Sequence, residues 1–394
     1  MRTRVAVVGA GPAGLLLSHL LTAAGVDCVV VEARSRAYVE ARLRAGILEQ
    51  PTVDLLRAAG VGERLDAQGL RHDGIHLQWP GERHRIDFPA LTGRSVWVYG
   101  QTEVVKDLVA ARLAAGAPLH FEVSDVAVHD VGTTSPRVSF TDAGGTARRL
   151  DADVVVGADG FHGICRPSIP AALARTWERG YPFAWLGVLA EVPPSTDELI
   201  YAWHPDGFAL HSMRSPSISR LYVQVDATER IEDWPDERIW EALQTRLGLP
   251  GWTLGTGPVL EKSITGMRSF VSSPMRHGRL FLVGDAAHIV PPTGAKGLNL
   301  AVADVAVLAE ALLEFFSSGS QTLLDGYEQR ALDRVWRATH FSWWMTSMLH
   351  TSGDGFDARL QLAQLQQVVS STAAATVLAE NYTGLPHALV GGPR

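Results

Sequence analysis

The residues best suited to chemistry begin with three glycines near the N-terminus. Gly9, Gly11 and Gly14 have the spacing G-x-G-x-x-G, and Glu32 ends the next apolar run. Such glycines allow a tight turn, let a pyrophosphate approach the backbone and let a helix pack on a strand. A carboxylate at the position of Glu32 can accept the hydroxyls of an adenosine ribose. These residues predict a site for a dinucleotide, either FAD or NAD, because both contain ADP.

The elements around these glycines are those of a βαβ unit. Residues 4–32, RVAVVGAGPAGLLLSHLLTAAGVDCVVVE, predict a β-branched strand, a glycine turn, a Leu-rich helix that starts at Pro12 and Ala13, and a second strand. The amides at the helix N-terminus would bind the phosphates. The apolar run after Arg2 and Arg4 could suggest a secretory signal, but glycines interrupt it.

Two further glycine-rich segments follow apolar strands. The segment GADGFHG contains Gly157 and Asp159, and GDAAHIVPPTGAKGLN contains Gly284 and Asp285. Strands of an α/β sheet deliver ligand-binding loops at their carboxyl ends. Asp is also a common turn residue, so each aspartate alone could be purely structural.

A third region predicts three antiparallel strands, in DELIYAWHPDGFALHSMRSPSISRLYVQVDA. Alternation gives one face Leu199, Tyr201, Leu210, Ser212, Arg214, Arg220 and Tyr222, and the opposite face Leu221, Val223 and Val225. An arginine held among apolar and aromatic groups needs an anionic partner, and its planar fork suits a carboxylate. An exposed arginine on a solvated face is the simpler alternative.

Together these motifs resemble the FAD-dependent aromatic hydroxylases. The likeness extends through RLRAGILEQ, VYGQTEV, LIYAWHPDGFAL, FSWWMTS and AENYTGLP, from near Val5 to near Pro386. It implies an α/β fold with a Rossmann-like FAD-binding domain, a mixed β-sheet substrate domain and C-terminal helices. The implied division is 1–72, 98–180 and 268–318 for FAD, 73–97 and 181–267 for substrate, and 319–394 for a helical region.

The resemblance also assigns the FAD site. The implied cofactor residues are Gly9, Gly11, Pro12, Ala13, Gly14, Glu32, Arg42, Arg44, Gln101, Asp159, Arg220, Asp285, Lys296, Gly297, Leu298 and Asn299. Asp285 would bond the ribityl chain, and Arg220 would support an inner position of a mobile isoalloxazine ring. Lys296 and the dipole of the helix that begins near Gly297 would stabilise the reduced, anionic flavin.

The implied reaction is hydroxylation of 4-hydroxybenzoate to 3,4-dihydroxybenzoate with O2 and NAD(P)H, through a C4a-hydroperoxyflavin. Ser212, Arg214 and Tyr222 match carboxylate-binding residues, and the Pro292 carbonyl would lie near the substrate hydroxyl. Deprotonating that hydroxyl activates the ring. Tyr201 and Tyr382 would relay the proton to His72 near the surface. Tyrosine, with an ordinary pKa of about 10, suits a relay better than a strong base.

The reductant would be bound transiently, because no second G-x-G-x-x-G opens a nicotinamide domain. Arg34, Tyr38, His162 and Arg268 match positions that the family links to the nicotinamide nucleotide. Where relatives have Arg-Gln after the acidic residue, this chain has Ala33 and Arg34. The choice between NADPH and NADH therefore stays open.

Composition narrows the partners. A net charge of −7 argues against nucleic acid, no stretch suggests a membrane span, and two cysteines fit a reducing cytoplasm without a metal site. Trp343, Trp344, Met345 and Met348 suggest a homodimer interface or extra core packing. Three alternatives remain: a hydroxylase of 3,4-dihydroxybenzoate or an aminobenzoate, a flavin reductase without oxygenation, and a nucleotide-binding regulator without turnover.

Overall fold

A mainly parallel sheet forms one half of the molecule in the computed structural model, which describes residues 1–41 and 46–385. Its strand order is β17 (Arg276–His277), β18 (Leu280–Leu282), β11 (Ala147–Gly157), β1 (Arg2–Val8), β2 (Cys28–Val31) and β8 (Leu119–His120). Strands β18, β11, β1, β2 and β8 run parallel, whereas β10 (Arg137–Thr141) and β9 (Ser124–His129) extend β11 as an antiparallel meander. Val5 to Val8 are almost fully buried, as expected for a parallel strand covered on both faces.

Helices cover this sheet and complete the predicted βαβ unit. Helix α1 (Pro12–Ala23) packs against α6 (Gln101–Ala114) and α8 (Gly297–Ser318). The shorter helices of this half are α2 (Arg36–Ala41), α3 (Gln50–Ala58) and α4 (Glu63–Gln68). The two cysteines are buried and free, in agreement with a packing role.

The second half is a mixed sheet in the order β19 (His288–Ile289), β16 (Val259–Ser273), β12 (Arg175–Ala190), β15 (Ile218–Asp226), β14 (Ala209–Ser215), β13 (Leu199–Ala202), β5 (Gly74–Trp79) and β6 (Glu82–Asp87). Helix α7 (Asp236–Leu247) covers one face. A small sheet of β3 (Ile47–Glu49), β7 (Val96–Val98) and β4 (Leu70–His72) completes the strands, and α5 (Phe88–Thr92) follows β6.

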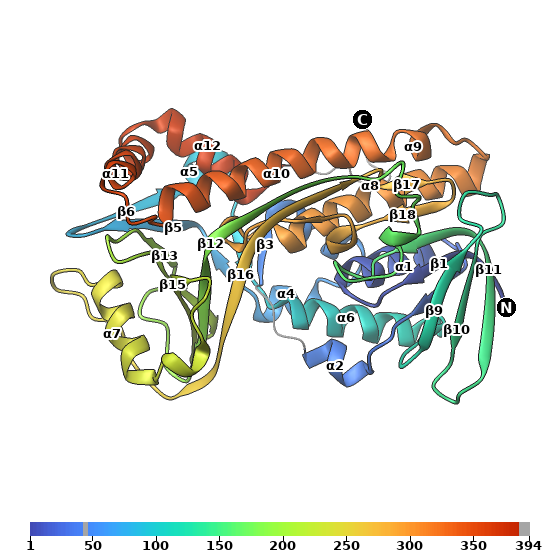
Figure 1. The fold of residues 1–394 in the computed structure, drawn as a ribbon, viewed down its shortest axis with the longest axis horizontal. Helices are drawn as coiled ribbons and strands as arrows, with labels where there is room; N and C mark the ends of the chain where they lie inside the picture. Colours follow the sequence, from blue (N-terminus) through green and yellow to red (C-terminus); the bar gives the residue numbers. More distant parts are fainter. Residues whose placement is uncertain (42–45, 386–394) are drawn as a thin grey trace.

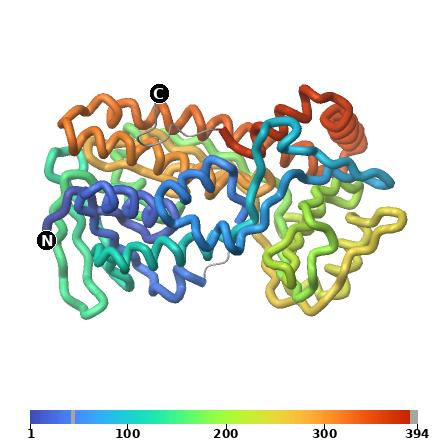
Figure 2. The backbone as a smooth tube through the Cα atoms, turned by 180° about the vertical axis from the view of Figure 1, so that it is seen from behind, coloured from blue at the N-terminus to red at the C-terminus, as the bar shows by residue number. Residues whose placement is uncertain are grey.

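The long strands β12 and β16 and the helix α10 (Tyr327–Leu349) connect the two halves (Figure 1). Seen from behind, the orange α10 still runs along one side of both halves (Figure 2). The remaining C-terminal helices are α9 (Thr322–Asp325), α11 (Gly355–Ser370) and α12 (Thr372–Thr383). The expected fold class is thus confirmed. The described residues contain no helix that is both long and apolar enough to cross a bilayer.

The predicted domain boundaries at residues 180 and 268 fall inside β12 and β16. These strands pair from Arg175 with Ser273 to Ala190 with Val259, and their register shifts between Gly180 and Ala184. The irregularity lies at the proposed boundary, but the ladder continues through it. The division into domains remains a prediction.

A buried arginine ties α6 to the βαβ unit. Arg112 is 1% exposed and donates to the carbonyls of Ser18, Cys28 and Pro118 and to the Thr22 hydroxyl. No carboxylate forms an ion pair with it within the described ranges. The guanidinium therefore adds four hydrogen bonds from a buried side chain, which join α6 to α1, β2 and the segment before β8.

We expect Arg112→Met to lower the free energy of unfolding by about 2–4 kcal/mol, because it removes the four hydrogen bonds of a buried side chain while keeping the apolar stem. Urea denaturation would measure the loss. Arg230→Met removes an arginine whose side chain is 75% exposed and should change stability by less than about 0.5 kcal/mol. Equal effects of the two substitutions would contradict the role of Arg112.

Candidate active site

The dinucleotide turn needs its glycines for steric reasons. Gly9 has a φ of +108°, and a Cβ there would lie 2.3 Å from the Ala158 carbonyl oxygen. A Cβ on Gly14 would lie 2.1 Å from the oxygen of Gly9, whereas the space beside Gly11 is open to 4.0 Å. The turn is therefore close-packed against β11 on one side and open where a phosphate would approach.

Polar groups around this turn are arranged for an anion and a ribose. Glu32 accepts hydrogen bonds from the amides of Ala10 and Arg34, at 2.7 and 2.8 Å, which leaves it further lone pairs for hydroxyl donors. Helix α1 begins without a side-chain cap from the described residues and without an acidic residue in its first turn. Its first amides are thus available to a phosphate.

The two other predicted aspartates lie at the carboxyl ends of β11 and β18. Asp159 accepts from the Cys165 amide at 2.9 Å, and burial raises its pKa. Its second oxygen is buried and lacks a hydrogen-bond partner among the described residues. Asp285 is exposed in the 3-10 turn η3 (Gly284–Ala286). Both can therefore accept hydrogen bonds from a ligand.

The segment from Pro292 to Gly297 is clamped against α10. Ala295 adopts a left-handed φ of 54°, a strained conformation for a residue with a Cβ. Thr346 donates to the Thr293 hydroxyl at 2.9 Å, and a Cβ on Gly294 would lie 2.9 Å from Ser342 Oγ. A Cβ on Gly297 would meet nothing within 4 Å. The clamp holds the segment close to α10 while its other side stays open.

Helix α8 begins directly after this clamp, with Lys296 as its N-cap and no side-chain cap from the described residues. Lys296 is 4% exposed and forms an ion pair with Glu49 at 2.5 Å. Burial lowers the lysine pKa, and the Glu49 charge opposes that shift. The positive charge expected of Lys296 is therefore partly neutralised by Glu49, a partner that the sequence did not reveal.

The side chain of Asn299 joins two elements of the structure. Its amide oxygen accepts from Glu49 N at 2.9 Å, and its nitrogen donates to the carbonyls of Ile47 and Ala295, both at 2.9 Å. The side chain thus fastens β3 to the start of α8. The flavin contacts expected of Gly297, Leu298 and Asn299 remain predictions.

A buried acid–histidine pair holds the Gly284–Asp285 turn, and sequence reasoning missed it. Asp304, 1% exposed on α8, accepts from Gly284 N at 2.8 Å and lies 2.6 Å from His288 Nε2. The aspartate charge raises the pKa of His288 in spite of burial. Because β19 carries His288 into the second sheet, the pair connects the turn to both halves. The only signal in the sequence was Asp304 itself, an acidic residue at a helical position otherwise occupied by apolar residues.

The substrate face follows the predicted alternation as far as Ser212, and the register of β14 shifts between Met213 and Ser215, at Arg214. Register pairs Tyr201 with Leu210, Leu210 with Tyr222, and Ser212 with Arg220. Leu199, Tyr201 and Leu210 belong to the core between this sheet and the C-terminal helices, whereas Leu221, Val223 and Val225 pack on the opposite face.

Arg214 is half-buried and donates to the Thr102 hydroxyl at 2.5 Å. Gly100 makes room for it, since a Cβ there would lie 2.2 Å from Arg214 Nη1. Among the described residues, no carboxylate forms an ion pair with Arg214. Burial, and then the charge of Arg220, lower its pKa. Because Arg214 is half-buried, the alternative of an exposed arginine on a solvated face is excluded. An anionic ligand would restore the missing counter-charge.

The structure brings the two predicted tyrosines together. The hydroxyl oxygens of Tyr201 and Tyr382 are 2.7 Å apart, and each residue is 1% exposed. Burial raises the pKa of both phenols, so they stay protonated at neutral pH. A buried pair of neutral hydroxyls can pass a proton along a hydrogen-bonded line but cannot act as a strong base.

The expected near-surface position of His72 is wrong. His72 is only 2% exposed, because alternation in β4 turns Arg71 outward and His72 inward. Burial lowers the pKa of His72 to about 4, and its Nδ1 has no hydrogen-bond partner in residues 1–41 and 46–385. Any relay through His72 therefore needs a further group before it reaches solvent.

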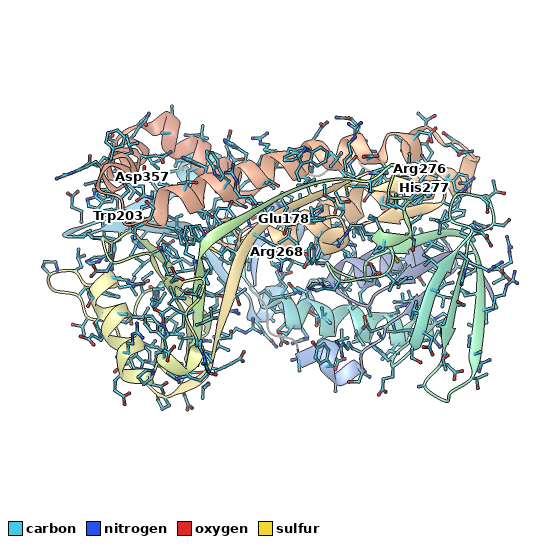
Figure 3. All side chains as sticks on the ribbon, in the orientation of Figure 1. Glu178, Trp203, Arg268, Arg276, His277 and Asp357 are labelled. Atoms are coloured by element: carbon cyan, nitrogen blue, oxygen red, sulfur yellow. The ribbon has the colours of Figure 1, made fainter. Side chains whose placement is uncertain are left out.

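The residues expected to bind a nicotinamide nucleotide form two separate contacts. The Arg34 guanidinium lies 5.2 Å from the Tyr38 ring centroid, and both side chains are exposed. The Phe161 ring contacts both His162 and Arg268. Its centroid lies 4.9 Å from the His162 ring centroid and 4.5 Å from the guanidinium carbon of Arg268. Arg268 also lies 3.9 Å from Glu178 on the neighbouring strand (Figure 3).

Four expected FAD residues gain less support. Arg42 and Arg44 lie outside the described residues. Gln101 is half-buried at the first position of α6, next to the Gly100–Thr102 segment that holds Arg214. Arg220 lies against Tyr222, with its guanidinium carbon 5.3 Å from the ring centroid. Their roles remain predictions.

Known flavin-dependent enzymes are similar to this chain in sequence and fold. A family model described as "FAD binding domain" matches residues 2–342. The chain is 52% identical to the p-hydroxybenzoate hydroxylase of Acinetobacter baylyi, over 98% of this chain and 96% of the relative. It is 28% identical to the 3-amino-4-hydroxybenzoate 2-monooxygenase of Streptomyces cremeus, over 84% of each chain. The p-nitrophenol 4-monooxygenase of Pseudomonas putida has a similar fold, with a TM-score of 0.83 at 20% identity over 97% and 99% of the two chains.

The residues present fit FAD. The open side of Gly11, the uncapped N-termini of α1 and α8, and the unpartnered oxygen of Asp159 are all features that a flavin dinucleotide would satisfy.

We expect Asp304→Asn to weaken FAD binding about tenfold and to lower the free energy of unfolding by about 3 kcal/mol, because it leaves His288 without its ionic partner. Fluorescence titration of the apoprotein with FAD and urea denaturation would measure the two effects. Asp333→Asn, on the exposed side of α10, serves as the control. Lower stability with unchanged FAD affinity would show that Asp304 supports the fold without positioning the turn.

Proposed function

The chain belongs to the FAD-dependent aromatic hydroxylases of the FAD binding domain family, and on that premise we propose that it converts 4-hydroxybenzoate to 3,4-dihydroxybenzoate. The reaction consumes NAD(P)H and O2. The observation that carries the proposal is Arg214, a half-buried cation without a carboxylate partner among the described residues, on β14, which pairs with the strand that bears Tyr201 of the buried Tyr201–Tyr382 pair. An aromatic acid with a para hydroxyl suits these two groups.

Arg214 binds the substrate carboxylate, and Ser212 and Tyr222 orient it from neighbouring positions on the same face. Leu210, paired with Tyr201, and Arg214 are four residues apart on β14. Four residues span about 13 Å of strand. Because side chains reach inward from both ends of this span, the gap between their polar groups can match the length of a benzoate. The substrate hydroxyl then lies beside Tyr201, with the Pro292 carbonyl on the opposite side.

When bound, FAD would supply the redox chemistry, in which NAD(P)H is oxidised, one oxygen atom of O2 enters the ring and the other is released as water. Tyr201 receives the phenol proton as it passes its own proton to Tyr382, which in turn passes one on toward solvent, so the pair relays the proton and the electron density of the ring carbon beside the hydroxyl increases. The near-complete burial of both tyrosines excludes water from this end of the site.

Arg34, Tyr38, His162 and Arg268 are proposed to meet the nicotinamide nucleotide. The two contacts they form could hold different parts of one extended ligand. Arg36 is paired with Glu40 at 2.7 Å, so Arg34 is the better candidate for a 2′-phosphate.

A homodimer is also proposed. Trp177 on β12 and Trp336 and Trp343 on α10 are 45%, 42% and 38% exposed, and the first two rings are 5.4 Å apart. Such an exposed aromatic group is typical of an interface core. Met345 and Met348 are fully buried and belong to the core instead. Sedimentation of the wild type and of Trp336→Glu would test this interface, which is wrong if both have the same mass.

The reaction is tested by anaerobic reduction of the flavin with NADPH or NADH, with and without 4-hydroxybenzoate, followed by air and product analysis. Faster reduction with the substrate and formation of 3,4-dihydroxybenzoate would support the proposal. Hydrogen peroxide as the sole product would instead indicate a flavin reductase, and greater turnover of 3,4-dihydroxybenzoate or an aminobenzoate would reassign the substrate.

Arg214→Gln should weaken 4-hydroxybenzoate binding about 100-fold, because a charge-assisted pair is lost from a half-buried site. The neutral ligand 4-hydroxybenzamide is the matched control. The wild type should prefer the acid over the amide, and the variant should lose that preference. An unchanged preference, measured by flavin absorbance titration, would show that the carboxylate lies elsewhere.

Tyr201→Phe should lower the product formed per NADPH at least tenfold and raise hydrogen peroxide correspondingly, because the phenol proton has lost its acceptor. The raised pKa of the tyrosine predicts the same loss throughout pH 6.5–8.5, as a neutral hydroxyl is present across that range. Tyr181→Phe, which loses a hydroxyl bonded to Ser269, should retain normal coupling. Full coupling in Tyr201→Phe would exclude the relay.

A further inference from the structure

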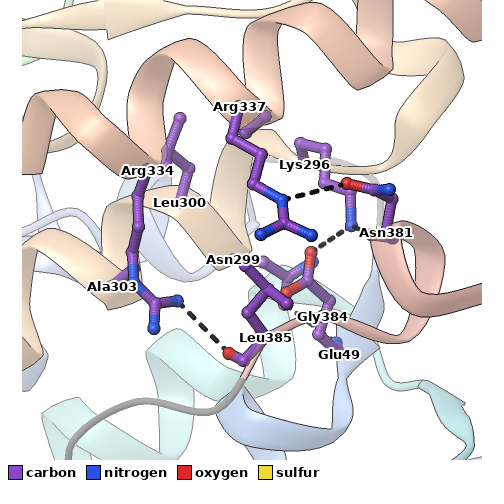
Figure 4. Close-up of a pocket in the computed structure, with 11 residues that line it drawn as sticks. Glu49, Lys296, Asn299, Leu300, Ala303, Arg334, Arg337, Asn381, Gly384 and Leu385 are labelled. Carbon is purple, nitrogen blue, oxygen red and sulfur yellow. Dashed lines mark hydrogen bonds and ion pairs between the residues drawn. The ribbon is translucent and has the colours of Figure 1, made fainter. Parts of the chain in front are cut away.

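Helix α10 contacts different parts of the molecule along its length. Its middle lies beside α12, where Arg337 Nε is 3.5 Å from Asn381 Oδ1 (Figure 4). Its last turn packs on the substrate sheet, because Met348 shares one core with Tyr201. His350 follows this turn and is 3% exposed. It is a buried titratable residue to which neither the tyrosine pair nor the arginine site gives a role.

Two neighbours determine the protonation state of His350. Trp185 Nε1 lies 2.6 Å from His350 Nε2, and an indole N–H can only donate. His350 Nδ1 lies 3.0 Å from the Thr346 carbonyl oxygen, which can only accept. The imidazole is therefore neutral, with its proton on Nδ1. Burial favours the same state, since it lowers the pKa of His350 to about 3.

The ring of His350 also packs on aromatic side chains of the sheet. Its centroid lies 4.7 Å from that of Phe183, with an angle of 11° between the rings, and 4.5 Å from that of Phe208. Residue 350 thus contributes two separable things, a stacked ring and a hydrogen-bond acceptor.

Trp185 connects His350 to the carboxylate end of the substrate face. Trp185 on β12 is 4% exposed, and its ring centroid lies 4.6 Å from that of Tyr222 on β15. Gly187 makes room for the Tyr222 ring, since a Cβ there would lie 3.1 Å from Tyr222 Cε1. The Tyr222 ring is therefore placed by the bare backbone of Gly187 and by the indole of Trp185.

We propose that His350 is a positioning residue, which holds the Trp185 indole so that Trp185 supports Tyr222 beside the substrate carboxylate. This inference rests on the proposed function, because it concerns recognition of an aromatic acid. Without the acceptor, the indole N–H would be buried and unsatisfied, and the indole would turn toward another acceptor. Tyr222 would then lose its support on one side.

The experiment is titration of the FAD-bound protein with 4-hydroxybenzoate and with the neutral 4-hydroxybenzamide, followed by flavin absorbance. His350→Phe keeps a stacked ring but lacks the acceptor. We expect it to weaken binding of the acid about tenfold and of the amide less than about twofold, because the lost hydrogen bond affects the carboxylate end. His350→Gln can place an amide oxygen near the position of Nε2 and should restore most of the preference for the acid.

The partner of the hydrogen bond provides a second measurement. In a Trp185→Phe background, His350→Phe should cause no further loss of preference, because the hydrogen bond is already absent. An equal loss in both backgrounds would show that His350 acts without Trp185 and would overturn the inference.

Tyr327→Phe is the control for a purely structural effect. Its hydroxyl donates to the Leu282 carbonyl at 2.7 Å from the opposite end of α10, and the residue is fully buried. This variant should lose stability but keep the preference for the acid. A wild type that binds neither ligand would overturn the proposed substrate class and this role with it. A wild type that prefers the acid, with the same preference in His350→Phe, would overturn the role of His350 alone.

Discussion

A half-buried guanidinium that has no carboxylate partner among the described residues is the constraint on which the substrate site depends. Arg214 is supported by a neutral hydroxyl, Thr102, and by the missing side chain of Gly100, both from the segment that begins α6. These contacts fix the orientation of the Arg214 guanidinium without neutralising its charge. The remaining charge selects an anionic ligand, and the apolar and aromatic face around it selects a flat one. The tyrosine pair then defines the opposite end of that ligand.

The cofactor and substrate regions are held together by a few buried contacts. Asp304 fastens the Gly284–Asp285 turn and His288, and His288 lies in the strand that joins the second sheet. Asn299 fastens β3 to α8, and Thr293 is bonded to α10. Each contact joins segments far apart in the chain. The position of the flavin segment therefore depends on the whole fold and not on the loop alone.

Local patterns predicted the elements better than they predicted their partners. Glycine spacing located the βαβ unit, and alternation sorted Tyr201 and Leu210 from Leu221, because both depend on nearby residues. The support of Arg214 by Thr102 joins residues with no relation in sequence, and no pattern marks it. The burial of His72 depends on which face of a short strand packs inward, which three residues cannot reveal. Only the family resemblance predicted that Tyr382 lies beside Tyr201, because no local pattern in the sequence links the two residues.

The ladder between β12 and β16 limits how the chain can change in length. Side chains alternate along both strands, so one inserted residue would turn every side chain beyond it to the opposite face unless a bulge absorbed it. The register shift already takes up an excess of two residues in β12, because the four positions from Gly180 to Ala184 face the two from Arg268 to Gly266 in β16. Related sequences should therefore gain or lose residues in the turn at His204–Gly207 far more readily than in either long strand, and length changes in β12 should cluster at residues 181–183.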